Sequence, residues 1–242
     1  MSQMIAATPR IGFDRFIRLE WATMALRLRA GLADHNDLNV ILDLAELGLA
    51  AKKKTRTVLN RLWLEPRSEL VEFADRGVNI FISNPGQSAA LCWGMSIVTY
   101  PFFGKVAELV GRLAFLQGDC ASAEVHRRMS EIYGEREGTY RMTNMVLQSQ
   151  ENWGAISREQ RGKRLKLSKL PPLPSEHMTE WLVEAVLRYH GKPLPIASLQ
   201  SMPVIYPIHF DQPLAYLASK SSTMAVLSEG PSQQFIALRS QL

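Results

Sequence analysis

The segment from Gly77 to Gly104 contains no charged side chain. Its second half, AALCWGMSIVTYPFF, is strongly apolar, but a helix that crosses a bilayer needs about 20 such residues. The turn-forming residues 84–88 (NPGQS) interrupt the segment before this half begins. We therefore expect a helix that is buried in the core of a globular protein, and no membrane partner.

The rest of the chain is consistent with an intracellular globular protein. Hydrophobic residues make up 46% of it, which is enough to form a core. Cys92 and Cys120 lie among apolar neighbours and lack the spacing of metal ligands, so we expect reduced thiols, no metal and no cofactor. The start, MSQMIAATPRIGFDR, has no basic head followed by an apolar run. We expect a cytoplasmic location.

Two boundaries divide the chain into three expected domains. The sequence Leu170-Pro171-Pro172-Leu173-Pro174 is a stiff linker that neither a helix nor a central strand can cross, and residues 83–86 form a softer turn. The N-terminal domain, 1–84, is helical. The middle domain spans 85–170. The C-terminal domain, 171–242, begins with a helix from a Ser175 cap to Gly191 and contains two short strands at 224–227 and 235–238.

The N-terminal domain shows helical spacing of apolar residues. Residues 13–30 predict one helix, and Asn36 or Asp37 is the expected cap of a second that ends at Gly48. The expected inner residues of that second helix are Val40, Ile41, Leu44 and Leu47. A third helix follows the basic residues 52–56 and stops at Pro66. This pattern fits a helix-turn-helix as well as any three-helix bundle.

The middle domain predicts a more specific arrangement. Amphipathic helices are expected at 105–117, 122–133 and 139–153, with Ser122 and Thr139 as caps and glycines at the ends. The short turn between the second and third helices is typical of a helix-turn-helix. Strands at 155–157 and 164–168 flank a turn that contains Gly162. The predicted fold class is mainly α: a helical bundle with a winged helix-turn-helix and a small C-terminal α+β part.

Basic residues are concentrated in two segments. Lys52 to Arg67 contains six basic residues and one acidic residue, and Thr139 to Leu170 contains seven and two. Each segment carries a net charge of +5, and because the whole chain also carries +5, the remainder carries −5. Such patches on an otherwise acidic chain indicate binding to a polyanion. The alternative is two solvated lysine-rich surfaces.

The residue types in these segments point to duplex DNA. Arg141, Asn144 and Gln148 fall on one face of the third helix, and such side chains pair with guanine or adenine in the major groove. The cations of the hairpin suit phosphates or a minor groove. The expected DNA contacts on the helix and hairpin are Thr139, Tyr140, Arg141, Asn144, Gln148, Arg158, Arg161, Lys163, Arg164, Lys166 and Lys169. The expected contacts in the N-terminal patch are Lys52, Lys53, Lys54 and Arg56.

Several runs of the chain resemble one family in their order. They are KKKTRTVLNRLWL, WGMSIVTYPFFGKVAELVGRL, the pair HRRMSEIYG and TYRMTNMVLQSQENWGAI, and the C-terminal MPVIYPIHFDQPLAYLASKSSTMAVLSEGPSQQFIAL. This order resembles the BrxA family of bacterial BREX phage-defence systems. The resemblance implies a helical DNA-binding protein of an antiviral defence locus, without enzymatic activity, and no catalytic residues carry over from it.

No sequence motif of an enzyme is present. A phosphate loop, GxGxxG, HExxH and GxSxG are all absent, and Trp153 is expected as a core residue rather than a stacking platform. We therefore expect a non-enzymatic DNA-binding protein. Two other functions remain open: an adaptor subunit of a multiprotein defence complex that docks on an acidic protein or RNA, and an autoregulatory transcription factor with a palindromic site.

Overall fold

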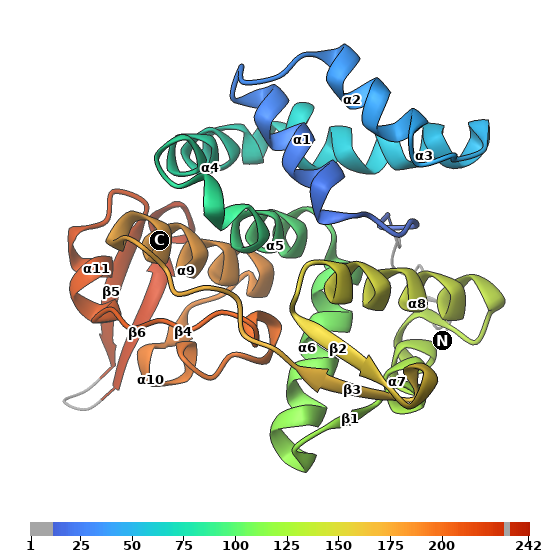
Figure 1. Cartoon of the computed structure of the whole chain (residues 1–242). Helices are drawn as coiled ribbons and strands as arrows, with labels where there is room; N and C mark the ends of the chain where they lie inside the picture. Colours follow the sequence, from blue (N-terminus) through green and yellow to red (C-terminus); the bar gives the residue numbers. More distant parts are fainter. Residues whose placement is uncertain (1–11, 230–232) are drawn as a thin grey trace, which may run out of the picture.

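The computed structural model describes residues 12–229 and 233–242. They form a mainly helical protein with two small three-stranded sheets (Figure 1). The predicted predominance of helix and the small C-terminal sheet are confirmed. The N-terminal stretch in which we expect no leader sequence lies mostly within residues 1–11, which are outside the described residues.

The N-terminal part is helical, as its periodicity predicts. Its elements are α1 (Leu19–Arg29), α2 (His35–Asp43), α3 (Leu49–Leu59), a π-helical turn (Asn60–Leu64), a 3-10 turn (Ser68–Leu70) and α4 (Val71–Ser83). The first helix begins later than expected. Phe13 and Ile17 are nevertheless buried, because the extended segment before α1 runs across the core.

The second helix buries a different face from the one that the spacing predicts. Asp34, not Asn36 or Asp37, is the cap, because its side chain accepts from the backbone of Asn36 and Asp37 while Asp37 accepts from Asp34. Leu38 and Leu42 face the core instead. Val40 and Leu44 are 49% and 78% exposed, so the prediction that both lie inside was wrong.

The middle part alternates helices with short strands. Its elements are a 3-10 turn (Pro85–Gln87), α5 (Ser88–Thr99), α6 (Pro101–Gln117), β1 (Cys120–Ala121), α7 (Ser122–Tyr133), α8 (Glu137–Asn152), β2 (Ile156–Glu159), a 3-10 turn (Gln160–Gly162) and β3 (Arg164–Leu167). The first sheet has the antiparallel order β1-β3-β2.

The C-terminal part packs a helix against a second sheet. Its elements are α9 (Glu176–His190), β4 (Leu194–Pro195), α10 (Ile196–Leu199), a 3-10 turn (Pro203–Ile205), α11 (Leu214–Lys220), β5 (Met224–Glu229), β6 (Gln233–Leu238) and a 3-10 turn (Arg239–Gln241). The sheet has the antiparallel order β4-β6-β5. The predicted Ser175 cap is confirmed, because its hydroxyl accepts from the Met178 N–H at 3.3 Å.

The charge-free segment is divided among three helices. It supplies the end of α4, the whole of α5 and the start of α6. The helical conformation is interrupted at Asn84 and again at Tyr100. Most of α5 is buried, which confirms the expected core helix. Within residues 12–229 and 233–242, no helix combines the length and the apolarity needed to cross a bilayer.

One continuous core joins the N-terminal, middle and C-terminal parts. The ring of Trp181 on α9 stacks on Phe73 of α4, with the ring centres 4.3 Å apart. The Trp181 indole also donates to the Phe73 carbonyl at 2.8 Å. Helix α9 thus packs directly on the N-terminal part, across the Pro-rich linker. The division into three domains stays a prediction.

The segment before α1 holds the end of α8. The backbone N–H of Ile17 donates to the Ser149 hydroxyl at 2.9 Å, and the Trp153 indole donates to the Ile17 carbonyl at 2.9 Å. Both bonds are buried, and Trp153 is only 2% exposed. Trp153 is a core residue, as predicted, and it fixes where α8 lies on the core.

We predict that Gly111→Ala destabilises the protein. A Cβ at Gly111 would clash with the Pro203 carbonyl oxygen, which belongs to the backbone and cannot swing away like the end of a flexible side chain. Overpacking of this kind costs about 1–3 kcal/mol. The free energy of unfolding from urea titrations measures it. The control is Gly138→Ala, where nothing lies within 4 Å and helix propensity favours alanine. Equal stability of Gly111→Ala and the unmodified protein would contradict the close approach.

Candidate nucleic-acid interface

Helices α7 and α8 are joined by a tight turn of residues 134–136. Gly134 has φ 88°, a conformation that side chains disfavour, so glycine suits the end of α7. Helix α6 precedes the pair, and strand β1 lies between α6 and α7. Strands β2 and β3 follow α8 and pair with β1 through β3. The order of elements is therefore α6-β1-α7-α8-β2-β3.

The expected role of Thr139 was wrong in two respects. Helix α8 begins at Glu137 with Arg136 at the cap position, so Thr139 lies inside the helix rather than at its cap. Thr139 is 0% exposed, so it cannot touch a nucleic acid. The earlier start rotates Thr139 to the inner face, where its carbonyl accepts from the Thr143 hydroxyl at 2.8 Å.

The outer face of α8 carries the other predicted residues. Tyr140 is 59% exposed and Arg141 is also exposed, while Asn144 and Gln148 are partly buried. They share this face because positions three, four and seven apart align on a helix. Among the ion pairs of the described residues, none joins Arg141 to Glu137. Arg136 is exposed beside this face, and the sequence reasoning missed it because it was placed in a loop.

The two faces of the hairpin separate its cations. Arg158 lies opposite Leu165 in the register, whereas Lys166 lies opposite Ser157. Because side chains alternate along a strand, Arg158 shares the inner face of the sheet with buried Leu165. Arg164 and Lys166 lie on the outer face, where both are exposed. The six cations of the hairpin therefore do not form one cluster.

Arg164 is already paired within the protein. Its guanidinium lies 2.8 Å from the Asp119 carboxylate, just before β1. This pair neutralises one of the charges that were counted as available for phosphates. Among the described residues, no acidic partner lies within ion-pair distance of Lys166 or Lys169, and both are exposed.

The tip of the hairpin carries two exposed cations, Arg161 and Lys163. Gln160, Arg161 and Gly162 have φ of 50°, 58° and 83°, so three successive residues are left-handed. This conformation is strained for residues with a Cβ, and such strain is common where a loop carries function. The left-handed conformation of these three residues makes the tip a tight turn.

The hairpin and α8 meet through Arg158. Its guanidinium donates to the Asn144 side-chain oxygen at 3.1 Å. The same guanidinium lies beside Gly162 at the tip, and Arg141 lies one helical turn from Asn144, so the tip and the outer face of α8 lie in one region. Had they lain on opposite sides of the molecule, a shared binding surface would have been excluded.

A stacked pair lies beside this contact. The ring of His126 on α7 lies 4.0 Å from the ring of Tyr140, with planes 21° apart. His126 is 8% exposed. Burial and the nearby Arg158 cation lower the pKa of His126 to about 4. No spacing within one helix predicts this pair, because its residues belong to two helices.

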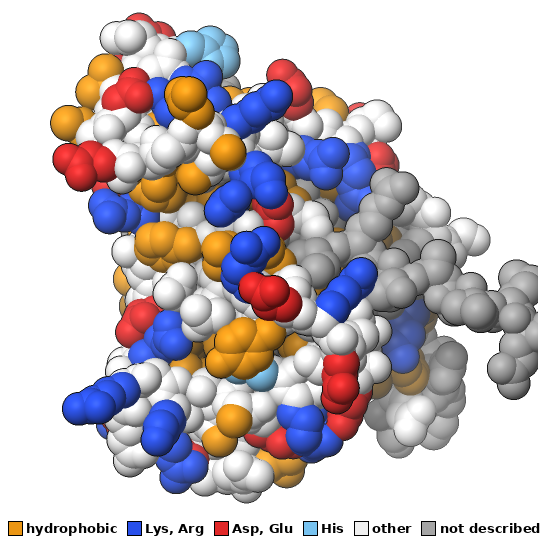
Figure 2. Space-filling view, turned by 90° about the vertical axis from the view of Figure 1, so that its right-hand side faces the viewer, with side chains coloured by type: hydrophobic (Ala, Val, Ile, Leu, Met, Phe, Trp, Pro, Cys, Tyr) orange, Lys and Arg blue, Asp and Glu red, His pale blue; other side chains and the backbone are white. Residues whose placement is uncertain are grey.

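The N-terminal basic patch is only partly available. Lys52 pairs with Asp43, and Lys54 lies 3.9 Å from the Asp14 carboxylate. Lys53 is exposed, and Arg56 is partly buried. Figure 2 shows the side of the molecule on which α3 and α8 lie in Figure 1. Lys and Arg side chains occur over its upper and lower parts, with acidic and apolar side chains among them.

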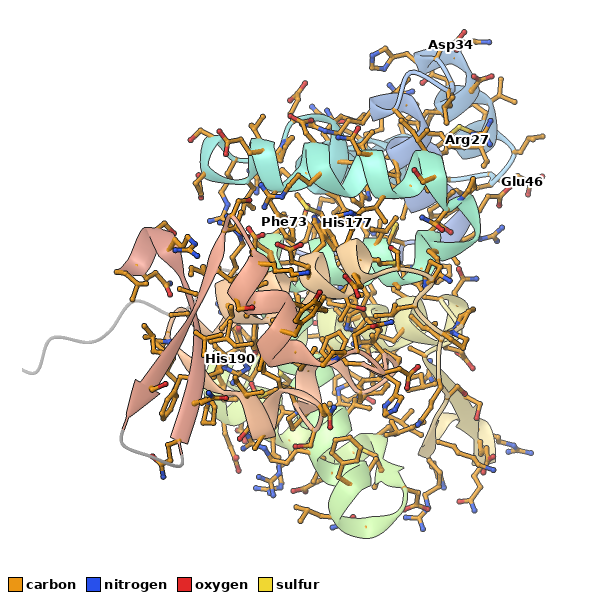
Figure 3. The ribbon with its side chains drawn as sticks, turned by 90° about the vertical axis from the view of Figure 1, so that its left-hand side faces the viewer. Arg27, Asp34, Glu46, Phe73, His177 and His190 are labelled. Carbon is orange, nitrogen blue, oxygen red and sulfur yellow. The ribbon has the colours of Figure 1, made fainter. Side chains whose placement is uncertain are left out.

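A separate cavity of about 600 Å³ lies between α4, the start of α9 and the segment before β5. Its lining includes Trp181 and His177 (Figure 3). Glu184 at its wall is 1% exposed and accepts from Arg76, Arg188 and Thr223. Within the described residues, no three His, Cys, Asp or Glu side chains gather as metal ligands would.

Comparison with known proteins yields no match: no family model, no curated protein and no solved structure shows significant similarity to this chain.

We predict that acid destabilises the protein partly through His126. Folded His126 stays neutral down to about pH 4, whereas in the unfolded chain it takes up a proton near 6.5. Stability from this group is therefore complete above pH 6.5 and is lost as the pH falls toward 4. Between pH 7 and pH 5 the loss is about 1 kcal/mol, because solvent screening near the surface reduces the effect of the full shift.

The measurement compares the free energy of unfolding of the unmodified protein and His126→Phe at both pH values. Phenylalanine keeps a ring against Tyr140 and cannot titrate, so its loss of stability should be smaller by this amount. Equal losses in both proteins would show that His126 is not held neutral.

Proposed function

We propose that the protein binds duplex DNA through a winged helix-turn-helix formed by α6, β1, α7, α8, β2 and β3. The hydrogen bond between Arg158 and Asn144 carries this proposal, because it joins the hairpin to the outer face of α8. Without that contact, the cations of the two elements would be only neighbours in sequence.

The order of the elements supports this assignment. Two helices joined by a three-residue turn with a glycine are typical of a helix-turn-helix, whose second helix enters the major groove. In the proposal α8 is that helix, with Arg141, Asn144 and Gln148 facing base edges. The hairpin is the wing, and its tip residues Arg161 and Lys163 contact phosphates or the minor groove.

The charges around this surface favour a polyanion, but only moderately. The exposed cations of residues 135–169 with no ion-pair partner among the described residues are Arg136, Arg141, Arg161, Lys163, Lys166 and Lys169. Glu135, Glu137, Glu151 and Glu159 are exposed in the same stretch. Four phosphate contacts would give a log–log salt slope of about −3.6.

The biological setting is also a proposal. The resemblance to the BrxA family supports a role in bacterial phage defence, in the cytoplasm, by binding rather than by catalysis. A gene neighbourhood rich in defence components would support this role, and a neighbourhood without them would count against it.

We predict that the double variant Arg161→Ala, Lys163→Ala weakens binding to duplexes of any sequence. Removing two phosphate contacts should make the log–log salt slope shallower by about 1.8. Anisotropy titrations at two or more salt concentrations measure both effects. The control is Lys192→Ala, Lys220→Ala, which removes the same charge after α9 and at the end of α11. An equal loss in both variants would show that net charge, not the wing, is responsible.

A second candidate function is that of an adaptor subunit, and one observation favours it. Apolar side chains are exposed around α2: Leu32, Val40, Leu44 and Leu49, of which Leu49 is 90% exposed. Val40 and Leu44 lie on one helical face, since they are four residues apart. Exposed apolar groups of this kind mark protein contacts.

We predict for this function that Leu44→Glu releases a bound protein partner, whereas Arg141→Ala leaves it bound. Co-purification after nuclease treatment, followed by size-exclusion chromatography, distinguishes the two variants. A partner that leaves only on nuclease treatment would favour DNA binding over the adaptor role.

A further inference from the structure

We infer that Arg158 fixes the side-chain amide of Asn144 so that Asn144 selects guanine rather than adenine in the major groove. This inference rests on the proposed function, because it concerns which base the proposed DNA-binding helix reads.

The orientation of the amide follows from the chemistry of its partner. A guanidinium has only N–H donors, so the group of Asn144 that faces it must be the carbonyl oxygen. The contact is 3.1 Å long. The amide NH₂ group of Asn144 then points away from Arg158, and it presents donors only.

The position of Arg158 is itself constrained. It projects from the inner face of β2, opposite Leu165, toward α7 and α8. A Cβ at Gly162 would lie 2.8 Å from the Arg158 guanidinium, so the missing side chain makes room for it. The Nε atom of Arg158 is buried and has no hydrogen-bond partner among the described residues. The burial, the space beside Gly162 and the bond to Asn144 therefore define the position of the guanidinium.

The consequence is a change in the base that Asn144 recognises. Pairing with adenine needs both an acceptor and a donor from the amide, because adenine presents N7 and an amino group. With its oxygen turned toward Arg158, the edge of the Asn144 amide that faces away from the hairpin offers only donors, which suit the N7 and O6 acceptors of guanine. Gln148, one turn away, has no hydrogen-bond partner among the described residues, so its amide can turn to suit either base.

The experiment selects duplexes from a randomised library with the full-length protein and then measures relative affinities. Asn144→Ala identifies the position that Asn144 reads, as the position where its preference disappears. At that position the unmodified protein should prefer guanine over adenine by roughly 5- to 150-fold. Arg158→Met should reverse or abolish this preference, because the freed amide can then turn.

Two controls separate this effect from a general loss of binding. Arg158→Lys keeps a donor of the same charge and should keep some preference for guanine. The preference at the position read by Gln148 should not change in Arg158→Met. A second readout needs no DNA. The two side-chain amide protons of Asn144 should interchange, by rotation about the C–N bond, more slowly in the unmodified protein than in Arg158→Met, as measured by NMR.

The outcomes distinguish the two proposals. If the unmodified protein binds no duplex, the proposed function fails. If it binds, but prefers adenine at the Asn144 position, shows no preference there, or keeps its guanine preference in Arg158→Met, the inference about Arg158 is wrong and the proposed function stands.

Discussion

The burial of α5 is the constraint on which the rest of the fold depends. This helix lies among α1, α4, α6, α9 and the π-helical turn, and nine of its residues are buried. A helix that is apolar all round can be stable in water only if other elements cover every side. The elements that cover α5 come from both the N-terminal and the C-terminal parts, and α9 also packs on Phe73 of α4. The N-terminal and C-terminal parts therefore stabilise each other through α5.

This core also positions the proposed interface. Helix α6 follows α5 directly at Tyr100, so its start is fixed by the core. The far end of α8 is held by the bonds of Ile17 with Ser149 and Trp153. The outer face of α8 thus lies on a packed support, while the β2–β3 hairpin is tied to the same body by the pairing of β1 with β3. A preorganised surface loses less conformational entropy on binding.

The sequence predicted what local rules control and missed what depends on contacts between elements. Gly118, Gly134 and Gly191 ended helices as expected, because positive φ favours glycine. Apolar and basic residues alternate in the sequence at Leu165 and Lys166, and the first is buried in β3 while the second is exposed. The cap preference of Thr139 failed because the helix starts earlier, at Glu137 with Arg136 as its cap. Asp119 with Arg164, His126 with Tyr140, and Arg158 with Asn144 join separate elements, and no spacing within one element could reveal them.

The distribution of charge determines what kind of binding this surface can support. Internal partners neutralise Arg164 and Lys52, so fewer cations remain for phosphates than the sequence suggests. Exposed carboxylates such as Glu137 and Glu159 lie among the remaining cations. Near a duplex they repel the backbone, which weakens binding to an arbitrary sequence. In the proposed complex with duplex DNA, contacts to base edges would then supply much of the affinity, and these would require the side chains of α8 to be held in a defined geometry. A fixed Asn144 therefore suits this surface better than a flexible one.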